Sequence, residues 1–398
     1  MSGREPRDRA DQHRADQHAA DQNLAALYPA DRVERARRLS VTAGLDALLI
    51  SPGPDLRHLT GYDALPLERL TCLVVPREGE AFLVVPELER PRAAESPVGA
   101  LGIEVLGWQE TDDPYALVAD RLRAALGETA AGAVAVSDRM WAVQALRLAE
   151  ALPGAIQRPA GPVLRDLRVR KTPAEVTALR EAGAAIDRVH DRVRGLRFAG
   201  RSERDVGREI SEMIVAEGHA TVNFVIVASG ANSASPHHDT GDRVMTRGDV
   251  VTVDIGGTTA AGYCSDSTRM YVVGGEVPPG FAEPYAALQA AQEAACALVR
   301  PGVTAEQVDA AARDVLTDAG YGEAFVHRTG HGIGLEEHEE PYIIAGNDEV
   351  LEPGMAFSVE PGFYLPGRYG ARIEDIVVVT DGGAERLNLV ERGLVPVE

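Results

Sequence analysis

Two stretches of the sequence place carboxylates inside runs of residues that favour β-strand. Residues 250–273 read V-V-T-V-D-I-G-G-T-T-A-A-G-Y-C-S-D-S-T-R-M-Y-V-V, and residues 356–379 read A-F-S-V-E-P-G-F-Y-L-P-G-R-Y-G-A-R-I-E-D-I-V-V-V. In each stretch two β-rich runs flank a glycine-containing connection, which is typical of a β-hairpin. The carboxylates within the apolar runs are Asp254, Asp266, Glu360 and Glu374.

These carboxylates predict a bound cation. If each hairpin turns about its midpoint, near Ala260 and Gly367, the two carboxylates of a pair face each other across the ladder, where like charges repel. Burying ionised carboxylates among valines costs several kcal/mol each unless a cation compensates for the lost hydration. A shared metal centre is therefore the simplest interpretation of both hairpins.

Histidines between the two hairpins extend the predicted ligand set. The segment H-R-T-G-H-G-I-G-L-E-E-H-E-E-P, residues 327–341, contains His331 and His338. Its glycines lack the spacing of a dinucleotide-binding loop, and its histidines lack the H-E-x-x-H spacing of a zinc helix. Carboxylates together with one imidazole, at His331, suit Mn²⁺, Co²⁺, Fe²⁺ or Zn²⁺ better than a metal that prefers thiolates. Four negative charges balance two divalent ions, and two adjacent ions can activate a bridging water.

An internal repeat predicts that the two hairpins converge. Residues 200–206, G-R-S-E-R-D-V, match residues 302–308, G-V-T-A-E-Q-V, at an offset of 102. Apolar residues at helical spacing keep this offset: Val206, Ile210, Met213 and Ile214 correspond to Val308, Ala312, Val315 and Leu316. After each of these helices comes a segment with histidine and then a carboxylate hairpin. Two such halves facing each other would bring the carboxylates to one point.

The chain is long enough for two or three domains, with 398 residues of which 45% are hydrophobic and 25% are charged. Strands alternate with helices over residues 24–160, which predicts an α/β domain. Residues 161–398 form the predicted second domain, so the fold class is α/β with α+β character. Residues 1–23 contain the polar repeat R-A-D-Q-H and are predicted to be a disordered or frayed helical tail.

Composition argues against several classes of partner. The net charge of −21 disfavours binding to a phosphate backbone, so no nucleic acid is expected. Apolar runs fall short of the ~18 residues that a membrane span needs, and the N-terminal sequence is not that of a signal peptide. Three cysteines form no ligand pattern, and the odd count suits a reducing cytoplasm.

The motifs around these residues resemble the pita-bread metallopeptidases, the superfamily of methionine aminopeptidase, aminopeptidase P and prolidase. The resemblance covers residues 24–398, and D-A-L-L-I-S-P-G-P-D-L-R-H-L-T-G-Y resembles the opening of the creatinase/prolidase-type N-terminal domain. The family's five metal ligands lie in V-D-I-G-G, S-D-S-T-R, G-H-G-I-G, V-E-P-G and R-I-E-D, and correspond to Asp254, Asp266, His331, Glu360 and Glu374. The resemblance implies that Asp254 binds one metal, that Asp266 and Glu374 bridge, and that His331 and Glu360 complete the other metal's shell. Asp254 and Asp266 are twelve residues apart, whereas many family members have eleven.

The resemblance also implies roles for residues outside the ligand set. His237 in S-P-H-H-D, with His238 as the neighbouring alternative, and His338 in E-E-H-E-E-P are expected to hold the scissile carbonyl and the developing oxyanion. Arg372 matches a family arginine that orients the ligands; its alternative reading is a strand arginine on a solvent face. Phe224, in N-F-V-I-V-A-S-G, matches an apolar residue that lines the pocket, or else belongs to the core.

The activity that the resemblance implies is hydrolysis of an N-terminal Xaa-Pro bond with two divalent metals, Mn²⁺ being the first expectation. Glu360 is expected to carry the proton from the attacking water to the leaving nitrogen. The N-terminal domain favours the Xaa-Pro branch over methionine aminopeptidase; Xaa-Pro dipeptidase is favoured, with aminopeptidase P on longer peptides as the alternative. Creatinase and non-catalytic pita-bread modules are rivals that have lost the ligand set. The expected partners are a short peptide with proline second and, by family habit, a second copy of the chain in a homodimer.

Overall fold

The computed structural model describes residues 26–127 and 132–398, so the tail predicted for residues 1–23 lies outside the described residues. The chain divides into two compact units between Arg168 and Val169, eight residues after the predicted division. Helix α7 (Gly161–Arg168) lies in the first unit because its apolar residues are buried in that unit's core. Within the described part of the chain, no helix is long and apolar enough to cross a membrane.

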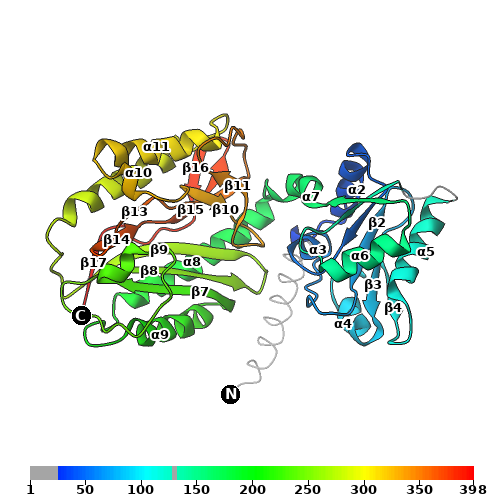
Figure 1. Cartoon of the computed structure of the whole chain (residues 1–398), viewed down its shortest axis with the longest axis horizontal. Helices are drawn as coiled ribbons and strands as arrows, with labels where there is room; N and C mark the ends of the chain where they lie inside the picture. The colour runs from blue at the N-terminus through cyan, green and yellow to red at the C-terminus, as the bar shows by residue number, and fades with distance from the viewer. Residues whose placement is uncertain (1–25, 128–131) are drawn as a thin grey trace, which may run out of the picture. The chain divides into compact units, whose positions relative to one another are not determined.

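A six-stranded mixed sheet forms the centre of the first unit, in the order β4-β3-β2-β1-β5-β6 (Figure 1). Its strands are β1 (Ala47–Ile50), β2 (Cys72–Pro76), β3 (Phe82–Pro86), β4 (Glu104–Trp108), β5 (Ala133–Val136) and β6 (Ile156–Pro159), and its helices besides α7 are α2 (Arg32–Thr42), α3 (Pro54–Thr60), α4 (Arg90–Glu95), α5 (Pro114–Leu126) and α6 (Ala142–Ala151). Leu48 and Ile50 enter one core cluster, whereas Ala47 and Leu49 enter another. Because alternate residues of a strand point to opposite faces, the sheet is covered on both sides. The α/β fold predicted for this part is confirmed.

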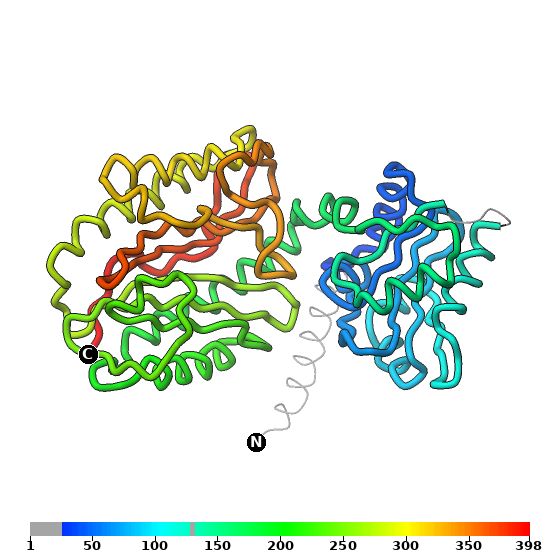
Figure 2. Tube along the Cα trace, in the orientation of Figure 1, coloured from blue at the N-terminus to red at the C-terminus, as the bar shows by residue number. Residues whose placement is uncertain are grey.

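The second unit repeats one arrangement, a pair of helices packed on a sheet. Helices α8 (Pro173–Val193) and α9 (Glu203–Ala216) pack on the sheet β17-β9-β8-β7, and α10 (Ala282–Leu298) and α11 (Ala305–Asp318) pack on the sheet β11-β10-β12-β15-β16. The strands are β7 (His219–Ser229), β8 (Val250–Thr259), β9 (Cys264–Val273), β10 (Gly330–Gly332), β11 (Glu339–Ile343), β12 (Ala356–Val359), β13 (Gly362–Leu365), β14 (Tyr369–Arg372), β15 (Asp375–Thr380), β16 (Gly383–Arg386) and β17 (Val395–Val397). In Figure 2 the orange and red C-terminal strands run beside the green strands β8 and β9; β14 contacts both of these strands, and β15 contacts β9. The predicted repeat therefore brings the two carboxylate segments together.

The first carboxylate hairpin has a different register from the predicted one. Asp254 pairs with Thr268, and Asp266 pairs with Gly256, so the two aspartates are diagonal neighbours rather than direct partners. The turn is centred one residue later than Ala260, because the connection uses Gly262 at a φ of +92°. Both aspartates still project from the same face, because Asp254 and Gly256 are two residues apart on one strand.

The second hairpin turns at Gly367, as predicted, with a φ of +73°. Its outer part is the two-stranded sheet β13-β14, and its inner part is the pair β12-β15. Glu360 and Glu374 lie between these two ladders, where neither residue belongs to a strand. Leaving the ladder frees both side chains to turn toward the first hairpin.

Candidate metal centre

The five predicted metal ligands come together in the second unit. They form three groups, and the ligand atoms within each group lie within 4.8 Å of one another. The groups are Asp254–Asp266–Glu374, His331–Glu360–Glu374 and Asp266–His331–His338. Because Asp266, His331 and Glu374 each belong to two groups, the three groups make one continuous cluster. Their roles as metal ligands remain predictions from the sequence.

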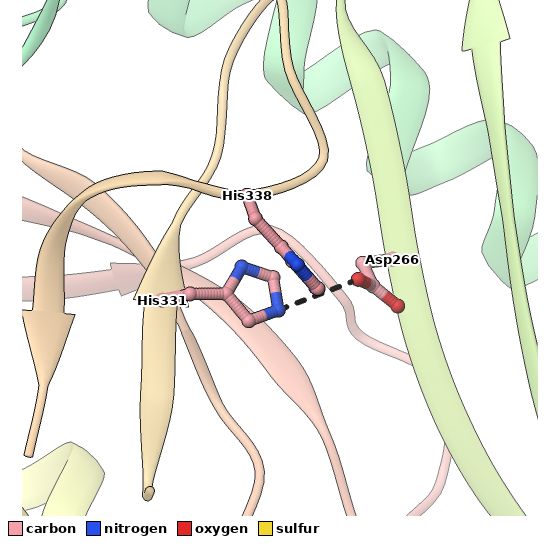
Figure 3. Close-up of side chains that lie close together, drawn as sticks. All are labelled: Asp266, His331 and His338. Atoms are coloured by element: carbon pink, nitrogen blue, oxygen red, sulfur yellow. Dashed lines mark ion pairs between the residues drawn. The ribbon is translucent and has the colours of Figure 1, made fainter. Parts of the chain in front are cut away.

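His331 points its Nε2 atom at the carboxylates. Nε2 lies 3.3 Å from Glu360 Oε1 and 3.7 Å from Asp266 Oδ2, and Figure 3 shows its imidazole directed at Asp266 on β9, with the His338 ring alongside. The Nδ1 atom of His331 lies 3.1 Å from the carbonyl oxygen of Gly332. A proton on Nδ1 that is donated to this carbonyl leaves the lone pair of Nε2 for a cation.

The cluster is electrostatically unfavourable when it holds only its own charges. Burial raises the pKa of Asp266 well above its ordinary value, and Glu374 raises it further; burial likewise raises the pKa of Glu374. Burial raises the pKa of Glu360 to about 7, although Arg372 opposes the rise. Burial lowers the pKa of His331 to about 3, so its imidazole is neutral at pH 7. A bound divalent cation inverts this balance for the carboxylates, because it favours their ionised forms.

One carboxylate oxygen of Asp254 is buried without a hydrogen-bond partner among the described residues. Its Oδ2 accepts a hydrogen bond from Arg372 Nη2, whereas its buried Oδ1 has no hydrogen-bond partner among the described residues. Buried polar atoms are almost always satisfied, so an orphaned carboxylate oxygen in a cluster of carboxylates fits a cation ligand. Carboxylates with one neutral imidazole also suit divalent ions in their chemistry. The residues present therefore fit the predicted metal.

A layer of hydrogen bonds holds the ligand candidates in place. Thr268 Oγ1 donates to Glu374 Oε2 at 2.8 Å and accepts from Arg372 Nε at 3.2 Å. Ser358 Oγ donates to Glu360 Oε1 at 3.1 Å and accepts from the backbone N–H of His331 at 3.0 Å. Partners of this kind fix ligand orientation in metal sites.

Arg372 is 3% exposed, so the alternative reading of Arg372 as a solvent-face arginine is wrong. Besides Asp254 it donates to the hydroxyl of Tyr364 at 2.6 Å, and this hydroxyl lies 2.9 Å from His327 Nε2. The sequence reasoning missed Tyr364 and His327, together with Thr268 and Ser358. Thr268 and Ser358 each lie two residues from a predicted ligand: Thr268 shares a face of β9 with Asp266, and Ser358 stands near the end of β12, just before Glu360. This spacing could have identified them.

The substrate-binding candidates surround the cluster. The ring of His338 lies 3.9 Å from that of His331, centre to centre. His237 is exposed in a turn after the short helix η2 (Gly230–Ala234), close enough that its charge lowers the pKa of His338, after the larger effects of burial and Arg328. His238 instead lies 2.9 Å from the buried carboxylate of Glu203.

Phe224 is half-buried, and its ring packs against Gly256, the residue opposite Asp266. A Cβ atom at Gly256 would lie 2.4 Å from the Phe224 ring, so this close approach requires glycine. Phe224 therefore lies beside Asp266, and its role as a pocket-lining residue stays a prediction.

Comparison with known proteins gives matches along most of the chain. Residues 177–381 match the sequence model of Metallopeptidase family M24, and residues 32–170 match that of the Creatinase/Prolidase N-terminal domain. The "Probable dipeptidase PepE" of Mycobacterium tuberculosis is 54% identical over 368 residues, which cover 92% of this chain and 96% of that protein. The "Xaa-Pro dipeptidase" of Lactobacillus helveticus is 36% identical over 355 residues, covering 88% and 94%. The crystal structure of dipeptidase PepE from Mycobacterium ulcerans superposes with a TM-score of 0.87 at 55% identity, covering 94% of this chain and 99% of that one.

Proposed function

The chain belongs to metallopeptidase family M24, and from this premise we propose that it is an Xaa-Pro dipeptidase that uses two divalent metal ions, with Mn²⁺ as the first expectation. The observation that carries the proposal is the orphaned Oδ1 atom of Asp254 within a cluster of buried carboxylates. The names of the similar proteins support the substrate class, because all three proteins named above are called dipeptidases and one of them an Xaa-Pro dipeptidase.

We propose the following ligand roles: Asp254 would hold one ion, His331 and Glu360 would hold the other, and Asp266 and Glu374 would contribute to both. When bound, such a pair of ions supplies a water of lowered pKa and positive charge near the developing oxyanion. Four carboxylates offset the charge of two divalent ions, which accounts for acidic residues in a buried site.

Side chains in and around the cluster transfer the proton, stabilise the oxyanion and contact the substrate. Glu360 takes the proton of the attacking water and delivers it to the leaving nitrogen. His338 and His237 donate hydrogen bonds to the carbonyl oxygen as it gains charge. Phe224 supplies an apolar wall for the substrate, and Arg372 orients Asp254.

We extend the proposal to a homodimer formed through the first unit. Several large apolar side chains there are more than 40% exposed: Trp141, Val143, Leu146 and Ile156. They lie on or beside α6 and on β6, which is the outer strand of its sheet. An exposed edge strand with apolar neighbours favours association. Light scattering should give twice the chain mass of 42.4 kDa; a monomer at micromolar concentration would contradict the proposed homodimer.

The cytoplasmic location remains a prediction from the cysteine content.

The activity is tested with chelated protein reloaded separately with Mn²⁺, Co²⁺, Zn²⁺ or Fe²⁺. Each sample is incubated with a Gly-Pro dipeptide and with an Xaa-Pro tripeptide, and the released amino acid is measured beside the metal content. We expect cleavage of the dipeptide that depends on metal, with two ions per chain.

Other outcomes select the rivals. Cleavage of the tripeptide as well as the dipeptide would favour aminopeptidase P. A protein that neither retains divalent metal nor cleaves either peptide would be a creatinase-type hydrolase or a binding module.

A further inference from the structure

Arg328 is a cation beside the cluster that has no acidic partner among the described residues. Its guanidinium carbon lies 4.5 Å from the centre of the Tyr342 ring, and no carboxylate within residues 26–127 and 132–398 forms an ion pair with it. Arg372, by contrast, is occupied by Asp254. A guanidinium presents planar donors that match a carboxylate, and stacking on an aromatic face leaves the N–H groups at its edge available.

The strand pairing places this guanidinium on the side of the cluster. Tyr342 is paired with His331 in the antiparallel ladder between β10 and β11. Side chains of paired residues project from the same face of the sheet, so the Tyr342 ring flanks the imidazole that points at Asp266. The positive charge of Arg328 also acts on His338 beside the cluster: it lowers the pKa of His338, although burial lowers it more.

We propose that Arg328 binds the C-terminal carboxylate of the substrate and thereby makes the enzyme selective for dipeptides. This inference rests on the proposed function. In a dipeptide the terminal carboxylate follows the scissile carbonyl by one residue, a separation of about 3.8 Å between successive Cα atoms. A side chain next to the cluster is therefore within reach of the carboxylate when the carbonyl lies at the metals.

A longer peptide cannot make the same contact. At the position of the carboxylate it presents an uncharged peptide group, and the chain then continues toward Arg328. Hydrogen bonds to a charged group are stronger than those between neutral groups, and a bidentate arginine–carboxylate pair adds directional selectivity. In the proposed metal-loaded site the four carboxylates and two divalent ions offset each other, so Arg328 adds a positive charge that attracts a substrate carboxylate and gives an uncharged peptide group no such attraction.

The first test compares wild-type, metal-loaded enzyme on Gly-Pro and on Gly-Pro amide, which differ only in the C-terminal charge. We expect kcat/KM to be roughly 10- to 100-fold higher for the free acid. The variant Arg328→Gln should raise KM for the free acid by a similar factor with little change in kcat, because ground-state and transition-state binding are lost equally. Its kcat/KM for the amide should stay within about twofold, and Arg328→Lys should lie between, since lysine keeps the charge but loses the bidentate geometry.

The matched control is Arg368→Gln. Arg368 also lies over a tyrosine ring, with its guanidinium carbon 4.9 Å from the centre of Tyr369. It stands at the turn of the second hairpin, where its backbone N–H donates to the carbonyl oxygen of Leu365. This variant should leave the preference for the free acid unchanged. Metal content and the thermal midpoint are measured for every variant, so that a folding defect is separated from a binding defect.

The test distinguishes a wrong role for Arg328 from a wrong proposed function. Wild-type enzyme that cleaves Gly-Pro and Gly-Pro amide equally well, or Arg328→Gln enzyme that keeps the wild-type KM and preference for the free acid, would overturn the role of Arg328 while leaving the dipeptidase assignment in place. Failure of the wild-type protein to cleave either compound with any divalent metal would instead overturn the proposed function.

Discussion

Replacing Glu360 with glutamine is expected to stabilise the metal-free protein at neutral pH and to remove most of the stabilisation that a divalent ion provides. The Glu360 side chain is only 15% exposed. Its pKa is raised to about 7, chiefly by burial and also by the charge of Asp254, with Arg372 opposing the rise. Glutamine has nearly the same shape and can still accept the hydrogen bond from Ser358, but it carries no charge that must be desolvated.

The sign and the size of this effect follow from proton linkage. Between pH 4.5 and about 7 the folded protein keeps the Glu360 proton while the unfolded chain has released it. The folded state then binds more protons, so its stability falls as the pH rises through this range. At about 1.4 kcal/mol for each pH unit, the interval corresponds to about 3 kcal/mol. The penalty is absent below about pH 4 and complete above about pH 7.

The assay is urea unfolding of chelated wild-type and Glu360→Gln protein at pH 4.5, 6 and 8. Far-UV circular dichroism follows the helices of both units, whereas both tryptophans, Trp108 and Trp141, lie in the first unit and report its unfolding by fluorescence. A dichroism change without a fluorescence change therefore reports unfolding of the second unit. We expect the variant to be up to about 3 kcal/mol more stable at pH 8 and equal at pH 4.5. Adding Mn²⁺ at 100 times its Kd should stabilise the wild type by about 2.7 kcal/mol and the variant much less.

A second glutamate provides the control. Glu385 is partly exposed, and hydrogen bonds from Arg180 lower its pKa, so Glu385→Gln should not stabilise the chelated protein at pH 8. The reasoning is refuted if chelated Glu360→Gln protein is less stable than the wild type at pH 8. A difference that stays constant down to pH 4.5 would also refute it, because the effect would then not come from the Glu360 proton.

Three other perturbations test the residues that support the site. Lys171, the single lysine of the sequence, is buried with its Nζ 2.5 Å from Glu339 Oε1. Lys171→Met should lower the free energy of unfolding by about 3–5 kcal/mol, because it leaves the buried charge of Glu339 without its partner. Adding Glu339→Leu removes that charge and should restore much of the lost stability. An amine-reactive reagent should modify Lys171 only after denaturation, and peptide mass spectrometry that finds it labelled in the native protein would contradict its burial. Asp266→Asn should reduce the bound metal and abolish dipeptide cleavage, whereas Asp242→Asn, at an exposed carboxylate, should change neither. Glu203→Gln should lower kcat/KM about tenfold with metal content unchanged, because the Glu203 carboxylate holds the loop that carries the proposed oxyanion donor; unchanged kinetics would separate that loop from catalysis.

Much of the fold could be predicted because its signals are local. The alternation of strands and helices before residue 160 indicated an α/β unit, and the repeat at an offset of 102 indicated two similar halves. Gly367 marked the second turn correctly because only its immediate neighbours determine that conformation. The first turn was predicted one residue too early. The prediction placed the turn midway between the two aspartates, near Ala260, and did not take into account that Gly262 adopts the positive φ of the turn.

The types and spacing of the candidate ligands were likewise visible in the sequence, since carboxylates in apolar strands are costly wherever the strands are placed. Only the tertiary structure decided which charges are satisfied: Arg372 pairs with Asp254, Lys171 pairs with Glu339, and Arg328 has no acidic partner within the described ranges. The paired residues are more than 100 positions apart, and periodicity carries no information about such contacts. They depend on how whole sheets and helices pack, and that packing determines where a charge is neutralised and where it stays available for a ligand.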